Sequence, residues 1–229
     1  MRVAIVENTA VTHHGQVGVA LHEAGALVDL HRPFLGQPLP DAFDALVVFG
    51  GEQSALDDAA HPYLPRLADL MARSARAGLP VLGICLGAQV LARGMGARNL
   101  IGATPEFGWC GVERLAGDDP LMQAVPARFP IFQWHSDTFT LPPGCAQLAR
   151  ADGAEVQAFR AGPRAWGTQF HFEASRVVVA DWARRFPEGV DRMDPAFRTA
   201  LPARAAAEGL EADAAGLALA RAFVAQIGA

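Results

Sequence analysis

Apolar residues gather in short runs along the first hundred residues, separated by polar loops and by stretches of helical periodicity. Apolar runs of this length are typical of strands buried on both faces of a sheet. The expected strands cover residues 3–6, 27–30, 45–49 and 79–84. A helix is expected over residues 15–24, closed by Gly25, and another directly after Cys85. This rhythm predicts an α/β fold, an open and mostly parallel sheet with helices on both faces.

The pattern changes after residues 94–96. Short β-like pieces follow, around residues 100–101, 112–115, 129–133, 146–149, 156–159 and 166–170. From about residue 175 the chain is rich in Ala and Arg and helical in pattern, and Pro187, Pro195 and Pro202 are expected to break the helices. No repeat or linker divides the chain, so residues 1–229 are expected to form a single domain. Its last helices are expected to pack against the sheet or to form the face of a homodimer.

Composition narrows the classes of function. The chain has 229 residues, and its formal net charge of −5 gives no reason to expect nucleic acid or an anionic membrane as a partner. No apolar run is long enough to span a bilayer, and the first residues enter a strand rather than a signal peptide, so a cytoplasmic location is expected. All 19 basic residues are arginine, which excludes a P-loop lysine or a lysine-bound cofactor. Neither ATP-spending chemistry nor a cofactor is expected in this chain.

Cys85 stands at the corner between an expected strand and an expected helix. Gly83 and Gly87 flank it in the spacing G-x-C-x-G, the cysteine form of the nucleophile elbow, a strained turn where glycines let two backbones approach closely. The positive end of the helix dipole favours a thiolate there. A lone cysteine in an apolar stretch is more often a small core residue, but this setting favours a nucleophile. Cys110 and Cys145 lack such a setting and are expected to be structural.

Gly50 and Gly51 follow another buried strand. The carboxyl ends of parallel strands meet at one edge of a sheet, so this pair and Cys85 are expected to meet there. A plain tight turn explains the pair as well. Beside an elbow, however, its exposed N–H groups form the second half of an oxyanion hole, and the N–H of Leu86 forms the first half.

The stretch W-G-T-Q-F-H-F-E, residues 166–173, places His171 near the end of a strand. If the extended backbone continues, alternation puts His171 and Glu173 on the same side. A cysteine nucleophile needs a base that takes and returns its proton, and that base needs a carboxylate to orient it. His171 and Glu173 supply these roles. H-x-E is also a pair of metal ligands in some proteins, but no third ligand is spaced to join them, so no metal is expected.

Several motifs together resemble the class I, or triad-type, glutamine amidotransferases. They are G-I-C-L-G-x-Q at the elbow, the upstream Phe49-Gly50-Gly51, and G-T-Q-F-H-x-E. Residues 106–109, 119–121, 133–138 and 141–144 are similar to the stand-alone subgroup related to the amidotransferase domain of GMP synthase. The resemblance implies a flavodoxin-like fold and an enzyme that hydrolyses the side-chain amide of L-glutamine through a Cys-His-Glu triad.

Carried to this sequence, the resemblance implies Cys85 as nucleophile, His171 as general base and acid, and Glu173 as its orienting carboxylate. It implies that Gly51 and Leu86 donate N–H groups to the oxyanion, although the register leaves Gly50 open as the donor. The remaining implied residues hold the substrate: Gln89, His135, Ser136 and Asp137. One position departs from the family, because Phe172 stands where proline is common between the histidine and the glutamate.

Three functions remain open from the sequence. In the first, a glutaminase subunit delivers ammonia to a separate synthetase chain, because nothing here resembles a nucleotide-binding synthetase domain. In the second, the same thioester chemistry hydrolyses γ-glutamyl amides or peptides without any partner. In the third, the chain is a non-catalytic regulatory module, against which the intact Cys85, His171 and Glu173 argue.

Overall fold

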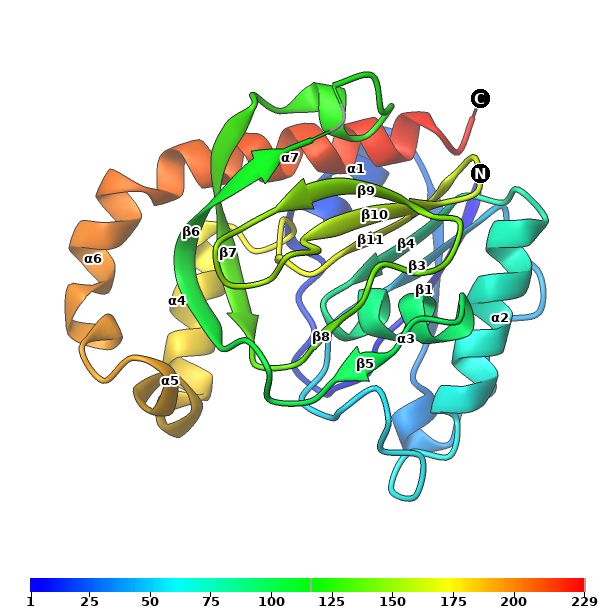
Figure 1. Cartoon of the computed structure of the whole chain (residues 1–229), viewed down its shortest axis with the longest axis horizontal. Helices are drawn as coiled ribbons and strands as arrows, with labels where there is room; N and C mark the ends of the chain where they lie inside the picture. The colour runs from blue at the N-terminus through cyan, green and yellow to red at the C-terminus, as the bar shows by residue number, and fades with distance from the viewer. Residues whose placement is uncertain (116, 229) are drawn as a thin grey trace.

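The first four apolar runs become strands of one nine-stranded sheet (Figure 1). The structure, a computed structural model, describes residues 1–115 and 117–228. Five strands lie side by side and parallel in the order β2 (Leu27–His31), β1 (Arg2–Val6), β3 (Ala45–Val48), β4 (Val81–Ile84) and β11 (Ala165–Thr168). All residues of β3, β4 and β11 are buried, which explains why β3 and β4 read as continuous apolar runs.

Four more strands extend the sheet by antiparallel pairing. In spatial order they are β10 (Ala158–Ala161), β9 (Ala146–Arg150), β6 (Glu106–Arg114) and β7 (Arg128–His135). Of the nine strands, only β10 and β6 point against the other seven, which confirms the expected mostly parallel sheet. β6 begins earlier than the sequence pattern indicates because it pairs along its length with β7. A separate two-stranded sheet joins β5 (Asn99–Leu100) to β8 (Thr138–Phe139).

Helices cover both faces of the sheet, as expected. On one face, α1 (Gly15–Glu23) and α7 (Gly209–Ala225) pack on the β1 side chains of Val3 and Ile5. On the other face, α2 (Leu64–Arg76) and α3 (Leu86–Gly94) pack on Ala4 and Val6 of the same strand. Figure 1 shows α7 running along one side of the sheet and α2 on the other. Alternation along β1 therefore supplies both cores from one strand.

The late helices are divided between two tasks. α7 lies on the sheet, whereas α4 (Arg176–Arg185), α5 (Pro187–Met193) and α6 (Phe197–Ala207) pack against the β6–β7 hairpin and form a third core rich in aromatic rings. α4 begins where the helical pattern was expected to begin, with Ser175 accepting a hydrogen bond from the N–H of Val178 at its cap. One expectation was wrong: Pro202 lies inside α6 and does not end it. Pro187, by contrast, occupies the first turn of α5, where its missing N–H costs no hydrogen bond.

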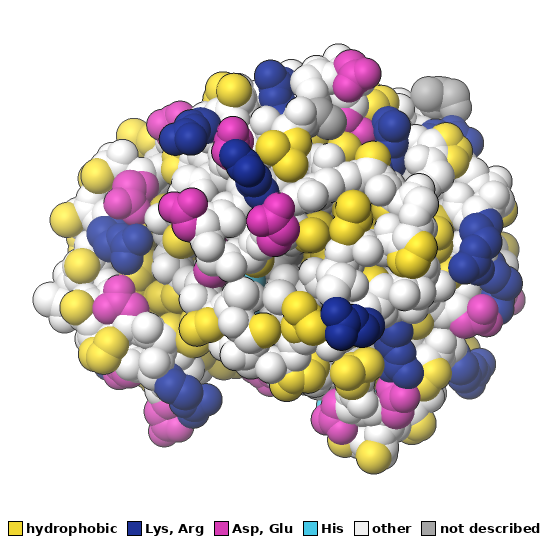
Figure 2. All heavy atoms as spheres, viewed as in Figure 1, with side chains coloured by type: hydrophobic (Ala, Val, Ile, Leu, Met, Phe, Trp, Pro, Cys, Tyr) yellow, Lys and Arg dark blue, Asp and Glu magenta, His cyan; other side chains and the backbone are white. Residues whose placement is uncertain are grey.

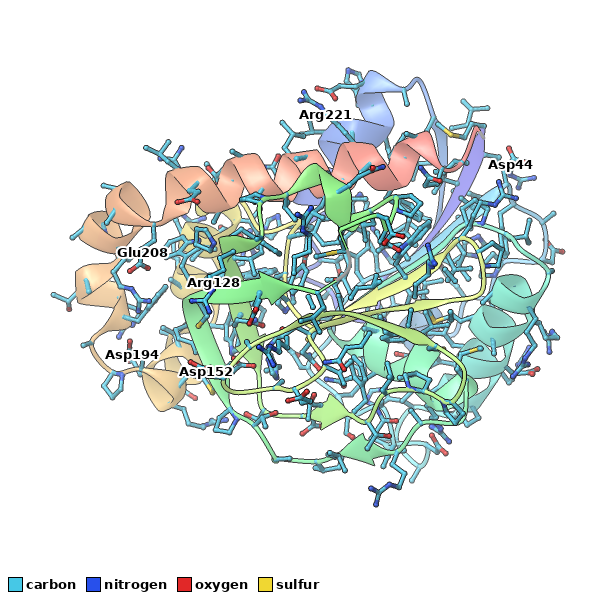
Figure 3. The ribbon with its side chains drawn as sticks, turned by 45° about the horizontal axis from the view of Figure 1, so that its top comes forward. Asp44, Arg128, Asp152, Asp194, Glu208 and Arg221 are labelled. Carbon is cyan, nitrogen blue, oxygen red and sulfur yellow. The ribbon has the colours of Figure 1, made fainter. Side chains whose placement is uncertain are left out.

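Charged side chains connect the late helices to each other and to α1. Arg204 of α6 lies 3.5 Å from the carboxylate of Asp194, which precedes the helix, and 3.4 Å from that of Glu208, which follows it. Asp194 and Glu208 lie at the same end of the molecule (Figure 3). Arg221 on α7 forms two 2.7 Å hydrogen bonds with Glu23 of α1. These ion pairs are partly exposed, so they orient the helices more than they stabilise them.

The outer surface carries both signs of charge. Figure 2 shows arginines and acidic side chains interspersed over the face seen in Figure 1, without one sign dominating it. Within residues 1–115 and 117–228, no helix combines the length and the apolar character needed to cross a membrane.

Candidate active site

Cys85 lies on a strained corner between β4 and α3. It is the one described non-glycine residue with a positive φ, 52°, combined with a ψ of −110°. Its N–H donates a 2.8 Å hydrogen bond to the carbonyl of Thr168 on β11, and α3 begins at the next residue. Residues other than glycine rarely adopt this backbone conformation, so the surrounding sheet must hold it in place.

The two glycines that flank Cys85 are required by backbone contacts. A Cβ on Gly83 would lie 2.5 Å from the carbonyl oxygen of Gly87, and a Cβ on Gly87 would overlap the carbonyl of Val48 on β3. Backbone atoms cannot move aside as a flexible side chain can. The G-x-C-x-G spacing therefore lets α3 start directly against β3 and β4.

His171 and Glu173 form a buried pair. His171 Nδ1 lies 2.7 Å from Glu173 Oε1, and 8% and 2% of the two side chains are exposed. Burial by itself acts to lower the pKa of His171, but the Glu173 carboxylate and the Cys85 sulfur act to raise it, and the pKa is raised well above the ordinary histidine value of 6.5. The Cys85 sulfur and the Glu173 carboxylate therefore both favour the charged form of the imidazole.

The extended backbone does not continue to His171 and Glu173, so strand alternation does not explain why the two side chains meet. β11 ends at Thr168, and the chain then turns, with the Thr168 hydroxyl donating a 3.2 Å hydrogen bond to the carbonyl of Phe170. The N–H of His171 donates to the carbonyl of Phe132 on β7, and the carbonyl of Glu173 accepts from the N–H of Gln16 on α1. Tertiary hydrogen bonds from two distant elements therefore fix the positions of both residues.

The loop after β3 passes directly beside the sulfur and the imidazole. A Cβ on Gly50 would lie 3.3 Å from His171 Cε1 and 3.5 Å from Cys85 Cβ. Leu86 is the first residue of α3, so its N–H has no acceptor within the helix. The glycine loop and the start of α3 thus both lie next to Cys85, where they can supply donors for an oxyanion.

A polar network that the sequence did not reveal holds this loop. Asn8, just after β1, donates a 2.7 Å hydrogen bond from Nδ2 to the carbonyl of Phe49, and its Oδ1 accepts one of 3.1 Å from the Tyr63 hydroxyl. Gln53 Nε2 donates to the Tyr63 oxygen at 2.6 Å and to the carbonyl of Asn8 at 3.1 Å. The backbone on both sides of the two glycines is therefore tied to β1. Its place two residues after the end of a buried strand is the one sequence signal that marks Asn8.

Gln89 and the turn at residues 135–137 border the same cleft, as the resemblance implied. Gln89 Nε2 donates a 3.1 Å hydrogen bond to the carbonyl of Asp137, and His135 Nδ1 lies 3.0 Å from that oxygen. His135 Nε2 lies 3.1 Å from a carboxylate oxygen of Glu106. Gln89 and His135 therefore brace this turn.

The other two residues of the turn point to different parts of the molecule. Asp137 Oδ1 accepts a 2.8 Å hydrogen bond from the N–H of Gly102. Ser136 Oγ lies 4.0 Å from the sulfur of Met193 on α5. Ser136 thus connects the turn to the helical wall of the cleft, while Asp137 connects it to the loop after β5.

Gln169 is a neighbour of Cys85 that the sequence analysis did not select. It is fully buried, and its Nε2 lies 3.8 Å from the Cys85 sulfur. Its Oε1 accepts a 3.4 Å hydrogen bond from Gln89 Nε2. On the opposite side, the Cys85 thiol lies 3.8 Å from the carbonyl of Trp134. The letter Q in G-T-Q-F-H was visible in the sequence, but nothing local indicated that its side chain faces the sulfur.

The cleft has a volume of about 830 Å³ and opens above Cys85, His171 and Glu173. One wall comes from residues 49–54 and the other from α4 and α5. His13 also lines the cleft, with Nε2 2.8 Å from Asp181 on α4. Within the described part of the chain, no group of three or more His, Cys, Asp or Glu side chains is arranged to hold a metal ion.

The other cysteines lie outside this cleft. Both are free and partly buried. Burial raises the pKa of the Cys110 thiol to about 11, and burial also raises the pKa of the Cys145 thiol. Neither thiol lies in surroundings that favour a thiolate, in agreement with the structural role expected for both.

The fold and the site define an α/β protein with a cysteine elbow, an adjacent histidine–carboxylate pair and an open cleft at the carboxyl ends of parallel strands. The chain belongs to the glutamine amidotransferase class-I family, which it matches over residues 20–178. The prediction of the family from the sequence motifs is thereby confirmed.

Relatives and solved structures agree with this membership. Over 135 residues the chain is 38% identical to the GMP synthase (glutamine-hydrolyzing) of Thermomicrobium roseum, covering 58% of this chain and 24% of that protein. It thus spans about a quarter of the length of that relative. It is 29% identical over 187 residues to a glutamine amidotransferase-like protein of Salmonella typhimurium, with 78% of each chain covered. The crystal structure of a glutamine amidotransferase from Thermotoga maritima superposes with a TM-score of 0.85 at 26% identity, covering 97% of each chain.

Proposed function

We propose that this chain hydrolyses the side-chain amide of L-glutamine to glutamate and ammonia through a γ-glutamyl thioester on Cys85. The observation that supports it most directly is the arrangement of Cys85 on a strained elbow next to the buried His171–Glu173 pair. Family membership supports the same chemistry, because amide hydrolysis of glutamine is general in class I amidotransferases. The alternative, a regulatory module without activity, gives no reason for a strained cysteine beside a histidine of raised pKa.

In the proposed reaction, the Cys85 thiolate attacks the γ-carbonyl carbon, a C–S bond forms, and the negative charge moves to the carbonyl oxygen. The N–H groups of Leu86 and of Gly51, or Gly50 in the other register, stabilise that oxyanion. The C–N bond then breaks as protonated His171 gives its proton to the departing nitrogen. Glu173 keeps the imidazole oriented and stabilises its charged form throughout.

Water completes the cycle. Neutral His171 takes a proton from a water molecule, which attacks the thioester carbon, and the C–S bond breaks to return the thiolate and release glutamate. The turn at His135, Ser136 and Asp137 is proposed to bind the α-amino and α-carboxylate groups of the substrate, because it borders the cleft beside Cys85. In this proposal Gln89 helps to hold the substrate by bracing that turn through its hydrogen bond to the carbonyl of Asp137.

We assign the transfer of ammonia to an acceptor molecule to a second protein chain. Several of its relatives are named GMP synthases, and the part that this chain matches is about a quarter of one of them. The sequence contains no lysine, so it has no P-loop lysine for spending ATP. A separate synthetase is therefore the proposed partner in any amide transfer, and no cofactor is needed for the hydrolytic half of the reaction.

The proposal is tested by intact-mass spectrometry of the protein quenched in acid during turnover of L-glutamine, together with glutamate release. We expect an added γ-glutamyl group on wild-type protein and none on Cys85→Ala. Cys110→Ala is the matched control, because Cys110 is also a free cysteine but lies outside the cleft, and we expect this variant to retain the adduct. Absence of both adduct and glutamate from the wild-type protein, with folding intact, contradicts the proposal.

A further inference from the structure

The wall of the cleft nearest to His171 is aromatic. The ring centroid of Trp182 on α4 lies 5.2 Å from that of His171, edge to face at 78°. Trp182 in turn lies 5.9 Å from Trp134, and Trp134 lies 6.0 Å from Phe186, the residue that joins α4 to α5. All three rings border the cleft. The same wall continues with Pro187, Gly189 and Met193 and also carries the charged residues Arg185, Glu188 and Arg192.

The proposed chemistry makes this wall the side of the leaving group. Glu173 occupies Nδ1 of His171, so Nε2 is the atom that can give a proton to the departing nitrogen. That nitrogen must therefore lie within hydrogen-bond reach of Nε2. A substituent on the nitrogen is therefore held close to the imidazole, and Trp182 is a ring that packs against that imidazole.

The cleft as a whole is much larger than ammonia requires. Ammonia is close in size to water, which occupies about 30 Å³ in the liquid. The whole cleft measures about 830 Å³, within the range of roughly 300–1,000 Å³ that accommodates drug-sized ligands. An apolar wall of three rings beside the leaving-group position also gains nothing from ammonia, which has no apolar surface to bury.

We infer that Trp134, Trp182 and Phe186 form a binding subsite for the amine half of γ-glutamyl amides whose amine carries an aromatic or large apolar group. The inference rests on the proposed thioester chemistry, and it makes L-glutamine the smallest member of the substrate class. The bond changes are those given above, with the C–N bond broken, the C–S bond formed, and the amine leaving neutral after it takes the proton of His171. The acyl half and the thioester are the same for every member of the class.

The sharpest test compares kcat/KM for γ-L-glutamylbenzylamide and for L-glutamine. The two substrates give the same acyl-enzyme, and benzylamine and ammonia are similar in basicity, so their ratio reports the binding of the benzyl group. Burial of a phenyl group predicts a ratio of at least about ten in favour of the benzylamide. A ratio of one or less overturns the subsite.

A matched pair of variants locates the effect. Phe186→Ala removes a ring from the proposed subsite, and we expect the ratio to fall by roughly fivefold. Phe34→Ala removes a phenylalanine that is also half-buried but borders a different cavity, of about 400 Å³, and we expect an unchanged ratio. Equal ratios for wild type and Phe186→Ala contradict the assignment. If Phe186→Ala does not fold, Met193→Ala tests the same wall.

The reverse reaction gives a second readout that needs no variant. Added benzylamine can attack the γ-glutamyl thioester formed from glutamine, and it then occupies the same subsite as a leaving amine. We expect more γ-glutamylbenzylamide than γ-glutamylmethylamide at equal concentrations of the two free amines. Thioester formation from glutamine without this preference removes the subsite but leaves the proposed function intact. Absence of a thioester from every substrate removes both.

Discussion

The two sides of the cleft are held in place by different kinds of contact. On the cysteine side, backbone contacts backbone, because Gly83 meets Gly87 and Gly87 meets the carbonyl of Val48. On the histidine side, rings contact rings, with Trp182 packed between His171 and Phe132. Backbone contacts admit one residue type at each position, whereas ring packing admits several of similar volume.

Because of this difference, the backbone at the Cys85 elbow must stay fixed, whereas the aromatic side chains around Trp182 can be exchanged. The proposed nucleophile lies on a strained corner whose backbone contacts at Gly83 and Gly87 leave no room for another geometry. The wall beside the leaving group can be repacked while His171 stays bound to Glu173 and to the carbonyl of Phe132. If the proposed function holds, the reaction chemistry is set on the side of Cys85, and the choice of substrate is open to change on the side of Trp182.

The largest effect is expected on the free energy of unfolding, when one substitution is made on each side of the cleft. Gly87→Ala places a Cβ against the Val48 carbonyl, which cannot move without displacing β3, and we expect a loss of at least about 3 kcal/mol in the free energy of unfolding. Phe197→Leu, in the aromatic cluster, should cost about 1–2 kcal/mol because neighbouring side chains can adjust. Urea unfolding followed by tryptophan fluorescence measures both. Equal costs for the two variants contradict the contrast.

The second prediction concerns the charge that holds His171 protonated. Glu173→Gln removes the carboxylate that raises the pKa of His171, while burial continues to lower it, so that pKa falls. The imidazolium is then lost at a lower pH, and the alkaline limb of the kcat/KM profile for glutamine moves to lower pH. We also expect kcat/KM at its optimum to drop on the order of a hundredfold, because the imidazole loses its charged partner.

The matched control is Glu113→Gln, on the surface of β6, where the carboxylate pairs with Arg150. We expect this variant to keep the wild-type pH profile. The same linkage applies to stability. Because the pKa of His171 is raised in the folded protein, its contribution is complete below pH 6.5 and is lost as the pH rises through the raised value. An unchanged alkaline limb in Glu173→Gln would falsify the assigned cause of the raised pKa.

The third prediction concerns the loop that carries the proposed oxyanion donors. Asn8→Ala removes the hydrogen bond to the carbonyl of Phe49, so the loop at Gly50 and Gly51 becomes less well positioned. Complete loss of an oxyanion donor costs roughly 10²–10³ in kcat, so a displaced donor should cost about tenfold, with little change in KM. Tyr63→Phe, which removes one hydrogen bond to Asn8, should show a smaller loss of the same kind. A change confined to KM would show that Asn8 does not position the oxyanion loop.

The contrast between local backbone contacts and long-range ring packing also explains which parts of the fold and the site could be predicted from the sequence. β1, β3 and β4 were predictable because every residue after the exposed Arg2 of β1 is buried, so that each strand reads as a local apolar run. The elbow was predictable because G-x-C-x-G is a local pattern that a backbone contact enforces. Local signals of this kind do not depend on the rest of the fold.

The rest depends on residues that meet only in the folded chain. Trp134, Trp182 and Phe186 lie on β7, on α4 and between α4 and α5, and no spacing links them. Asn8 and Tyr63 join across two loops in the same way. Pro202 was misjudged for a related reason, since packing of α6 against the hairpin maintains the helix despite the missing N–H. Burial and long-range contact decided these features, and a single sequence does not display either.

The smallest expected effect is at the elbow, where the usual stability difference between alanine and glycine should be reversed. Alanine is normally more stabilising than glycine in a folded chain, by about 0.5–1 kcal/mol. At Cys85 the φ of 52° and ψ of −110° strain any residue with a Cβ, by about 1–3 kcal/mol. We therefore expect Cys85→Gly to be more stable than Cys85→Ala by about 1 kcal/mol in urea unfolding, although neither has a thiol.

Ala88→Gly, three residues further along in α3, is the matched control and should be destabilised by about 1 kcal/mol or more, as in an ordinary helix. Opposite signs at residues 85 and 88 would show that strain is stored at the corner itself. If glycine is less stable than alanine at both positions, so that Cys85→Gly unfolds more easily than Cys85→Ala, the inference of a strained elbow is contradicted. Strain of this kind can persist on the cysteine side because the backbone contacts at Gly83 and Gly87 leave the chain no relaxed alternative, whereas a strained ring on the histidine side would relax by repacking.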